Sequence, residues 1–102
     1  MAAIQHIMQT LALRLVSLAN YDGQEPPDTY YAKLRGINET ARLLAVGGFN
    51  AAAKTDVMKS KMSGRFFPVS AQNLYNANTN IVTEAEFFNW LQGKYREVML
   101  GN

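Results

Sequence analysis

The residues that could do chemistry in this chain are few and scattered. There is one histidine, His6, and no cysteine, so the chain has no thiol nucleophile, no disulfide and no cysteine-based metal site. A catalytic histidine needs a carboxylate or another group to orient it, and His6 has none nearby in the sequence. Asp22, Glu25 and Asp28 share one loop but lack the ligand order of a calcium-binding EF-hand. We therefore expect no catalytic residue, no metal and no cofactor.

The stretch LAVGGFNAAAK, residues 44–54, raises the question of phosphate binding. A P-loop has the spacing G-x-x-x-x-G-K-[ST] after a hydrophobic strand, and neither feature is present. The pair Gly47-Gly48 instead follows a leucine-rich stripe, and glycine readily takes the left-handed conformation that ends a helix. Asn50 can then cap a new helix. The pattern predicts a turn between two helices.

Length and composition indicate one folded domain. The chain has 102 residues, of which 48% are apolar and 18% charged, which argues against intrinsic disorder. The first 20 residues have no lysine or arginine before their apolar run, and they are too short and too polar to span a bilayer. We expect a single helical domain over residues 1–102 that is cytoplasmic and does not enter a membrane.

Apolar residues recur with the 3.6-residue period of a helix in four segments. The first segment covers about residues 3–20. The second follows a proline pair, with Asp28 or Thr29 as its cap, and ends at the glycine pair. Its apolar stripe is Tyr30, Leu34, Ile37, Ala41, Leu44 and Ala45. The third covers about residues 51–62 and has apolar side chains on two opposite faces.

The fourth helix has the clearest start signal. Thr83 and Glu86 have the spacing of a capping box, in which each side chain bonds the backbone of the other. The helix should run to about Leu100. Before it, residues 65–80 are irregular and rich in asparagine, which favours turns; Ser70 can cap a single turn there. We expect four apolar side chains to pin this connection onto the helices: Phe66, Phe67, Leu74 and Tyr75. The fold class we expect is all-α: a small four-helix bundle-like domain with an irregular, Asn-rich connection before the last helix.

Several large side chains lie outside the main apolar stripes of these helices. Trp90 lies about 60° from the apolar arc of the fourth helix, at ~100° per residue. The third helix has one more apolar stripe than a peripheral helix needs, unless the domain itself buries both. Aromatic and methionine side chains are enriched in interface cores. We expect the following residues to contact a partner: Trp90, Met58, Met62, Lys94 and Leu13.

The function we expect is a small protein–protein interaction module, an adaptor, inhibitor or assembly subunit, without catalytic activity. The partner is another protein or a second copy of the chain, and a two-fold homo-oligomer is the commonest way to cover such a surface.

A second hypothesis is binding of nucleic acid or of a nucleotide phosphate. The net charge is +2, but residues 33–65 contain seven lysines and arginines against two acidic residues, a balance of +5. Such a segment can attract an anionic partner. The candidate anion-binding residues are Lys33, Arg35, Arg42, Lys54, Lys59, Lys61 and Arg65.

Overall fold

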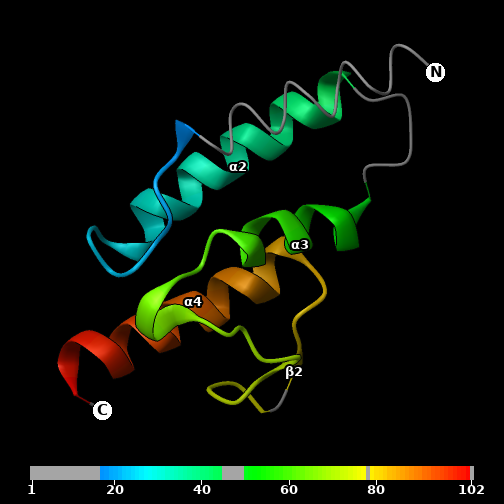
Figure 1. Cartoon of the computed structure of the whole chain (residues 1–102). Helices are drawn as coiled ribbons and strands as arrows, with labels where there is room; N and C mark the ends of the chain where they lie inside the picture. The colour runs from blue at the N-terminus through cyan, green and yellow to red at the C-terminus, as the bar shows by residue number, and fades with distance from the viewer. Residues whose placement is uncertain (1–16, 45–49, 78, 102) are drawn as a thin grey trace.

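The computed structural model describes residues 17–44, 50–77 and 79–101, with residues 41–44 described in their backbone only. Three α-helices account for most of this part of the chain (Figure 1). The elements in order are α2 (Pro27–Leu44), α3 (Ala51–Ser60), the 3₁₀ turn η1 (Gly64–Phe66), β1 (Gln72–Asn73), β2 (Thr79–Asn80) and α4 (Glu84–Leu100).

The prediction of an all-α four-helix bundle is therefore wrong. The described residues form three helices and a two-stranded antiparallel sheet. Of the predicted helix at 3–20, only residues from Ser17 onward are described, and the backbone is already non-helical from Leu18. The predicted turn at Gly47-Gly48 and the single histidine, His6, lie outside the described residues.

The asparagine-rich connection forms the sheet that the sequence did not predict. Gln72 pairs with Asn80 and Asn73 with Thr79, around a turn in which Ala77 has a φ of 52°. The asparagines correctly predicted a turn. The turn connects two strands, and the single helical turn expected after Ser70 does not form. Strands of two residues are too short to show the alternating pattern by which a strand is recognised in a sequence.

The predicted caps of α3 and α4 are confirmed. The side chain of Asn50 accepts a hydrogen bond from the backbone N–H of Ala53 at 2.9 Å, as expected of an N-cap. Thr83 and Glu86 form the complete capping box. Gly101 then ends α4 in the left-handed conformation, with a φ of 75°. Local sequence therefore fixes where these helices begin and where α4 ends.

Aromatic side chains hold the core together at the start of α2. The ring of Tyr21 lies 4.7 Å from that of Tyr30 and 4.8 Å from that of Phe66, measured between centroids. The backbone of Tyr21 also bridges to the segment after α3: its N–H donates to the Lys61 carbonyl at 2.8 Å, and its carbonyl accepts from the Ser63 N–H at 2.9 Å. Tyr21, Tyr30 and Phe66 are all fully buried.

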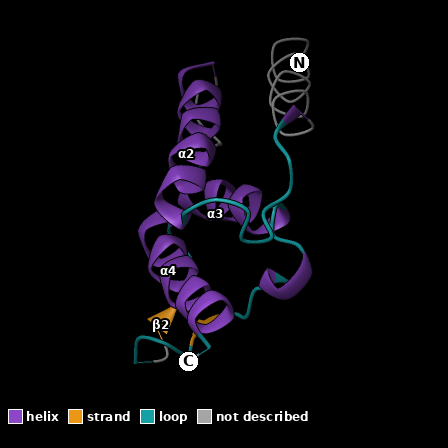
Figure 2. Ribbon diagram, turned by 90° about the vertical axis from the view of Figure 1, so that its left-hand side faces the viewer, coloured by secondary structure: helices purple, strands orange, loops and turns teal. Residues whose placement is uncertain are grey.

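The helices and the hairpin follow one another along the molecule. Figures 1 and 2 both show α2 at one end and α3 in the middle, with the hairpin and the C-terminal end of α4 at the opposite end. Helix α4 packs against α2, α3, η1 and β1. No helix within the described ranges is long and apolar enough to cross a membrane.

Candidate functional site

Three of the residues predicted to contact a partner lie in the core. Met58, Met62 and Trp90 are 0%, 4% and 3% exposed. Trp90 packs against Phe87 with ring centroids 5.8 Å apart. The helical wheel placed Trp90 outside the apolar arc, but a helix with neighbours on several sides buries more than one stripe. Because these side chains are buried within one chain, they cannot form an exposed contact surface.

The two remaining predicted contact residues are placed differently. Lys94 forms an ion pair with Glu97 on the same helix, with 2.9 Å between Nζ and Oε2. Leu13 lies outside the described residues. Met58, Met62 and Trp90 thus share one buried cluster, and the described residues of the predicted set do not form an exposed contact surface.

The candidate anion-binding residues are also dispersed. Lys33 is paired with Glu25 at 2.8 Å, and the Arg35 guanidinium lies 6.0 Å from the centre of the Tyr31 ring. Lys61 is only 8% exposed, and this burial lowers its pKa.

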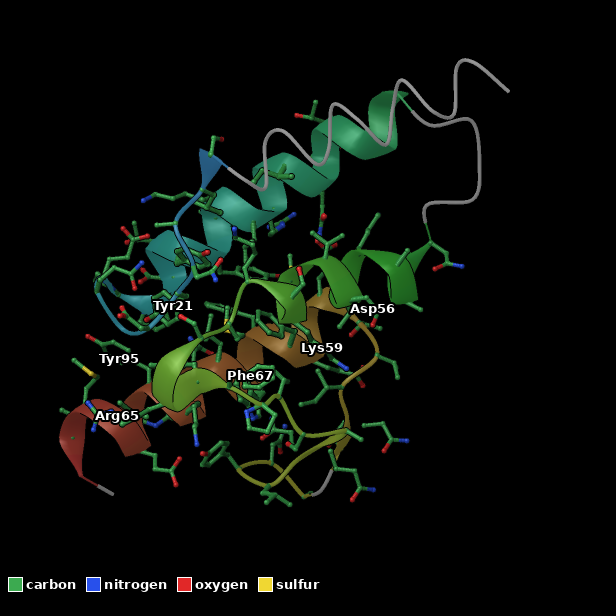
Figure 3. The ribbon with its side chains drawn as sticks, viewed as in Figure 1. Tyr21, Asp56, Lys59, Arg65, Phe67 and Tyr95 are labelled. Carbon is green, nitrogen blue, oxygen red and sulfur yellow. The ribbon has the colours of Figure 1, made fainter. Side chains whose placement is uncertain are left out.

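The remaining candidate anion-binding residues do not lie together on one surface. The side chain of Arg42 lies outside the described residues. Lys54 and Lys59 are on α3, whereas Arg65 is on η1, and Figure 3 shows Lys59 and Arg65 well apart. The positive balance of residues 33–65 therefore does not form one basic patch among the residues that the structure describes.

Exposed large apolar side chains of the described residues occur in residues 67–75, at Val82, and at Met99 and Leu100 near the end of α4. Residues 67–75, which we call the 67–75 segment, include Phe67, Leu74 and Tyr75, which are 66%, 72% and 41% exposed. The sequence suggested that these side chains, with Phe66, pin the connection onto the helices. Phe66 does so, and Tyr75 contacts α4 at Gly93 and Glu97. Phe67 follows Phe66 in extended backbone and projects outward. The sequence did not predict this exposed surface, because side chains in irregular backbone are buried or exposed without a regular spacing along the chain.

Hydrogen bonds of asparagine side chains anchor the 67–75 segment to α4. Asn73 is 1% exposed, and its Nδ2 donates to Oδ1 of Asn89 at 2.6 Å. Its own Oδ1 accepts from the N–H of Tyr75 at 2.9 Å. Because both polar atoms of a buried amide are satisfied, the segment is fixed in one position relative to the helix.

Tyr75 provides a second anchor. Its ring lies so close to Gly93 that a Cβ added there would be 2.6 Å from the ring's Cγ, so only glycine permits this contact. Its hydroxyl donates to Glu97. Burial, together with that hydrogen bond, raises the pKa of Tyr75 to about 12, so the hydroxyl remains a donor at neutral pH. The signal in the sequence was a glycine inside a helix, but it is ambiguous, because Gly36 in α2 has no such close approach.

A polar cleft lies between the hairpin and the first turns of α4. Its volume is about 230 Å³. In the part of the chain that the structure describes, no group of three metal-ligating side chains comes together here or elsewhere. The residues that line the cleft are Asn73, Asn76, Thr79, Ala85, Glu86 and Asn89.

Glu86 is the one charged residue in the lining of this cleft. Its Oε1 accepts hydrogen bonds from the N–H of Val82, the N–H of Thr83 and the hydroxyl of Thr83, each at 3.0 Å. The bond from Val82, together with those from Thr83, lowers the pKa of Glu86, so the carboxylate is ionised at neutral pH.

Comparison with known proteins gives no relative from which a function can be transferred: no family model, no curated protein and no solved structure matches the chain. The site therefore has to be interpreted from its own geometry.

Proposed function

We propose that the protein is a non-catalytic protein–protein interaction module that contacts its partner, another protein or a second copy of the chain, through the 67–75 segment. The observation that carries this proposal is the combination of exposed apolar side chains with a firmly anchored backbone. Phe67 and Leu74 are about two-thirds exposed or more. The segment that bears them is fixed to α4 by Asn73 and Tyr75.

Pre-organisation favours binding at such a segment. A loop that orders only on binding loses conformational freedom, which subtracts from affinity. Here Asn73 and Tyr75 already hold the backbone in place, so little conformational entropy is lost when a partner binds. Aromatic side chains are also enriched at the centre of protein interfaces, where they contribute much of the binding energy.

The basic alternative has weaker support. Lys33 forms an ion pair with Glu25, and Lys61 is buried, so neither offers a free charge to phosphate. Binding of nucleic acid depends on several cations that act together along one surface.

The experiment that tests the proposal is partner capture with variants of the exposed side chains. The double variant Phe67→Ser/Leu74→Ser removes both apolar groups without touching the buried anchors. Leu100→Ser is the matched control, because Leu100 is 66% exposed, like Phe67, but lies at the end of α4. The tagged chain is crosslinked in the cells that produce it, and captured proteins are quantified by mass spectrometry.

We expect the wild-type chain and Leu100→Ser to capture the same proteins, and the double variant to lose them. All three chains should unfold at the same temperature, which shows that the loss concerns contact and not folding. Equal capture by the double variant would contradict the proposal.

A further inference from the structure

The segment that contributes all the lining residues of the polar cleft, residues 66–93, carries only negative charge. From Phe66 to Gly93 the chain contains no lysine, arginine or histidine, and its two charged residues are Glu84 and Glu86. Oε2 of Glu84 accepts a hydrogen bond from Asn38 of α2 at 3.0 Å. Glu86 lines the cleft. The cleft therefore carries a negative charge that no cation of the same region neutralises.

The carboxylate of Glu86 has capacity for another donor. All three hydrogen bonds that it accepts from the described residues end on Oε1. Oε2 therefore remains available to a group that enters the cleft. A carboxylate can accept about four hydrogen bonds through its two oxygens, so these contacts do not saturate it.

Side-chain amides complete the lining. Asn89 uses its Oδ1 to accept the bond from Asn73. Asn76 binds the hairpin through its backbone carbonyl, which accepts from the N–H and the hydroxyl of Thr79 at 3.1 and 2.8 Å. Asn76 also lines the cleft, and its side-chain amide carries both a carbonyl acceptor and an N–H donor. Asn89 thus presents its remaining Nδ2 donor, and the unused charged acceptor among the lining residues is Oε2 of Glu86, which suits a cationic donor.

The size of the cleft narrows the choice of ligand. Sites for drug-sized molecules have volumes of roughly 300–1,000 Å³. The cleft, at about 230 Å³, is smaller and suits a single side chain. Two of its lining residues, Asn73 and Asn76, flank the exposed Leu74 and Tyr75 in the sequence. A partner that covers these apolar side chains can therefore insert a side chain into the cleft.

We propose that the cleft between the hairpin and α4 binds one basic side chain, arginine or lysine, of the partner protein, with Glu86 as its counter-charge. The inference rests on the proposed function and adds the chemistry of the partner. A guanidinium suits the site best, because its planar fork can donate to the Glu86 carboxylate and to a neighbouring carbonyl at the same time.

A titration of the full chain with two blocked amino acids tests the inference. N-acetyl-arginine methylamide carries the charge, and N-acetyl-citrulline methylamide has nearly the same shape without it. We expect the arginine compound to give saturable NMR shifts of the side-chain amides of Asn76 and Asn89, and the citrulline compound to give none. Equal shifts with both compounds, or none with either, would overturn the inference.

The variant Glu86→Gln separates charge from structure. Glutamine serves at this position of a capping box as glutamate does, so α4 should still begin at the same residue. We expect binding of the arginine compound to weaken about tenfold, as for loss of a charge-assisted hydrogen bond. Unchanged affinity in this variant would show that Glu86 is not the counter-charge.

Partner capture distinguishes this inference from the function on which it rests. If Glu86→Gln and the double variant at Phe67 and Leu74 both lose the captured proteins, both proposals are supported. If only the double variant loses them, the contact surface stands and the basic side chain is ruled out. If neither variant loses them, the proposed function fails as well.

Discussion

At the α2 end of the molecule irregular backbone is held by buried rings, whereas at the hairpin end it is held by amide hydrogen bonds. Tyr21 and Phe66 lie outside the α-helices and are fully buried, and their packing adds to the backbone hydrogen bonds that Tyr21 forms with Lys61 and Ser63. In the connection before α4, Asn73 and Asn89 do the fixing. Phe67 and Leu74 remain in solvent.

This difference shows how a small domain divides its apolar side chains between stability and contact. Burial of a large apolar side chain stabilises a fold by about 1.5–3 kcal/mol. The aromatic cluster uses its side chains in this way. Because a satisfied pair of amides holds the hairpin, Phe67 and Leu74 are not needed for that purpose and are available to another molecule.

We expect the largest loss of stability from a substitution in the buried core. Trp90→Ala should lower the free energy of unfolding by about 3–5 kcal/mol, because it leaves a cavity in the core. Phe67→Ala should change it by less than about 0.5 kcal/mol, since the ring lies in solvent. Chemical denaturation followed by circular dichroism measures both. Similar effects of the two substitutions would remove the distinction between core and contact surface.

The next largest effect on stability is expected from alanine substitutions at two helix glycines, which form a matched pair. A Cβ at Gly93 would clash with the Tyr75 ring, whereas a Cβ at Gly36 would meet nothing within 4 Å. Gly36→Ala should stabilise the fold by about 1 kcal/mol through helix propensity. Gly93→Ala should destabilise it by about 1 kcal/mol, because the clash outweighs the same gain. A stabilising effect of Gly93→Ala would show that Tyr75 does not anchor the segment.

The start of α4 should contribute a moderate amount of stability. Thr83→Ala removes the hydroxyl that accepts from the N–H of Glu86. The loss of an N-cap costs about 1 kcal/mol. An unchanged denaturation midpoint would contradict the capping box. Thr83→Ser is the control, because serine caps a helix as well as threonine does.

We expect the smallest change in stability from a substitution in the hairpin turn. Ala77 has a φ of 52°, which an L-residue with a Cβ adopts at a cost that glycine avoids. Ala77→Gly should therefore stabilise the fold by about 0.5 kcal/mol, after allowing for the greater freedom of glycine in the unfolded chain. Ala32→Gly on the exposed face of α2 should instead destabilise by about 1 kcal/mol. A loss of stability in both variants would argue against the turn geometry.

Local signals in the sequence predicted the starts of α3 and α4 but not that of α2, which begins at Pro27, so the predicted caps Asp28 and Thr29 lie inside the helix. Asn50, Thr83 and Glu86 act as caps in the structure as their spacing indicates, because capping depends only on residues within one turn. The apolar stripe of the second helix is also confirmed at Tyr30, Leu34 and Ile37, which are all buried. These features follow from a single helix and its period.

Features that depend on several elements were not predictable in the same way. The burial of Trp90 depends on what surrounds α4, and a helical wheel shows one helix without its neighbours. The anchoring of Asn73 by Asn89 joins residues 16 positions apart across a hairpin that has no strand pattern. The candidate site is built from such pairs, so the sequence indicated its residue types but not its position.

The most direct test of the contact surface is site-specific photo-crosslinking in the cells that produce the protein. Benzoylphenylalanine is placed at Phe67 in one chain and at the equally exposed Leu100 in another. We predict a discrete covalent adduct from position 67 and none from position 100. No adduct from position 67, or the same adduct from both positions, would contradict the account.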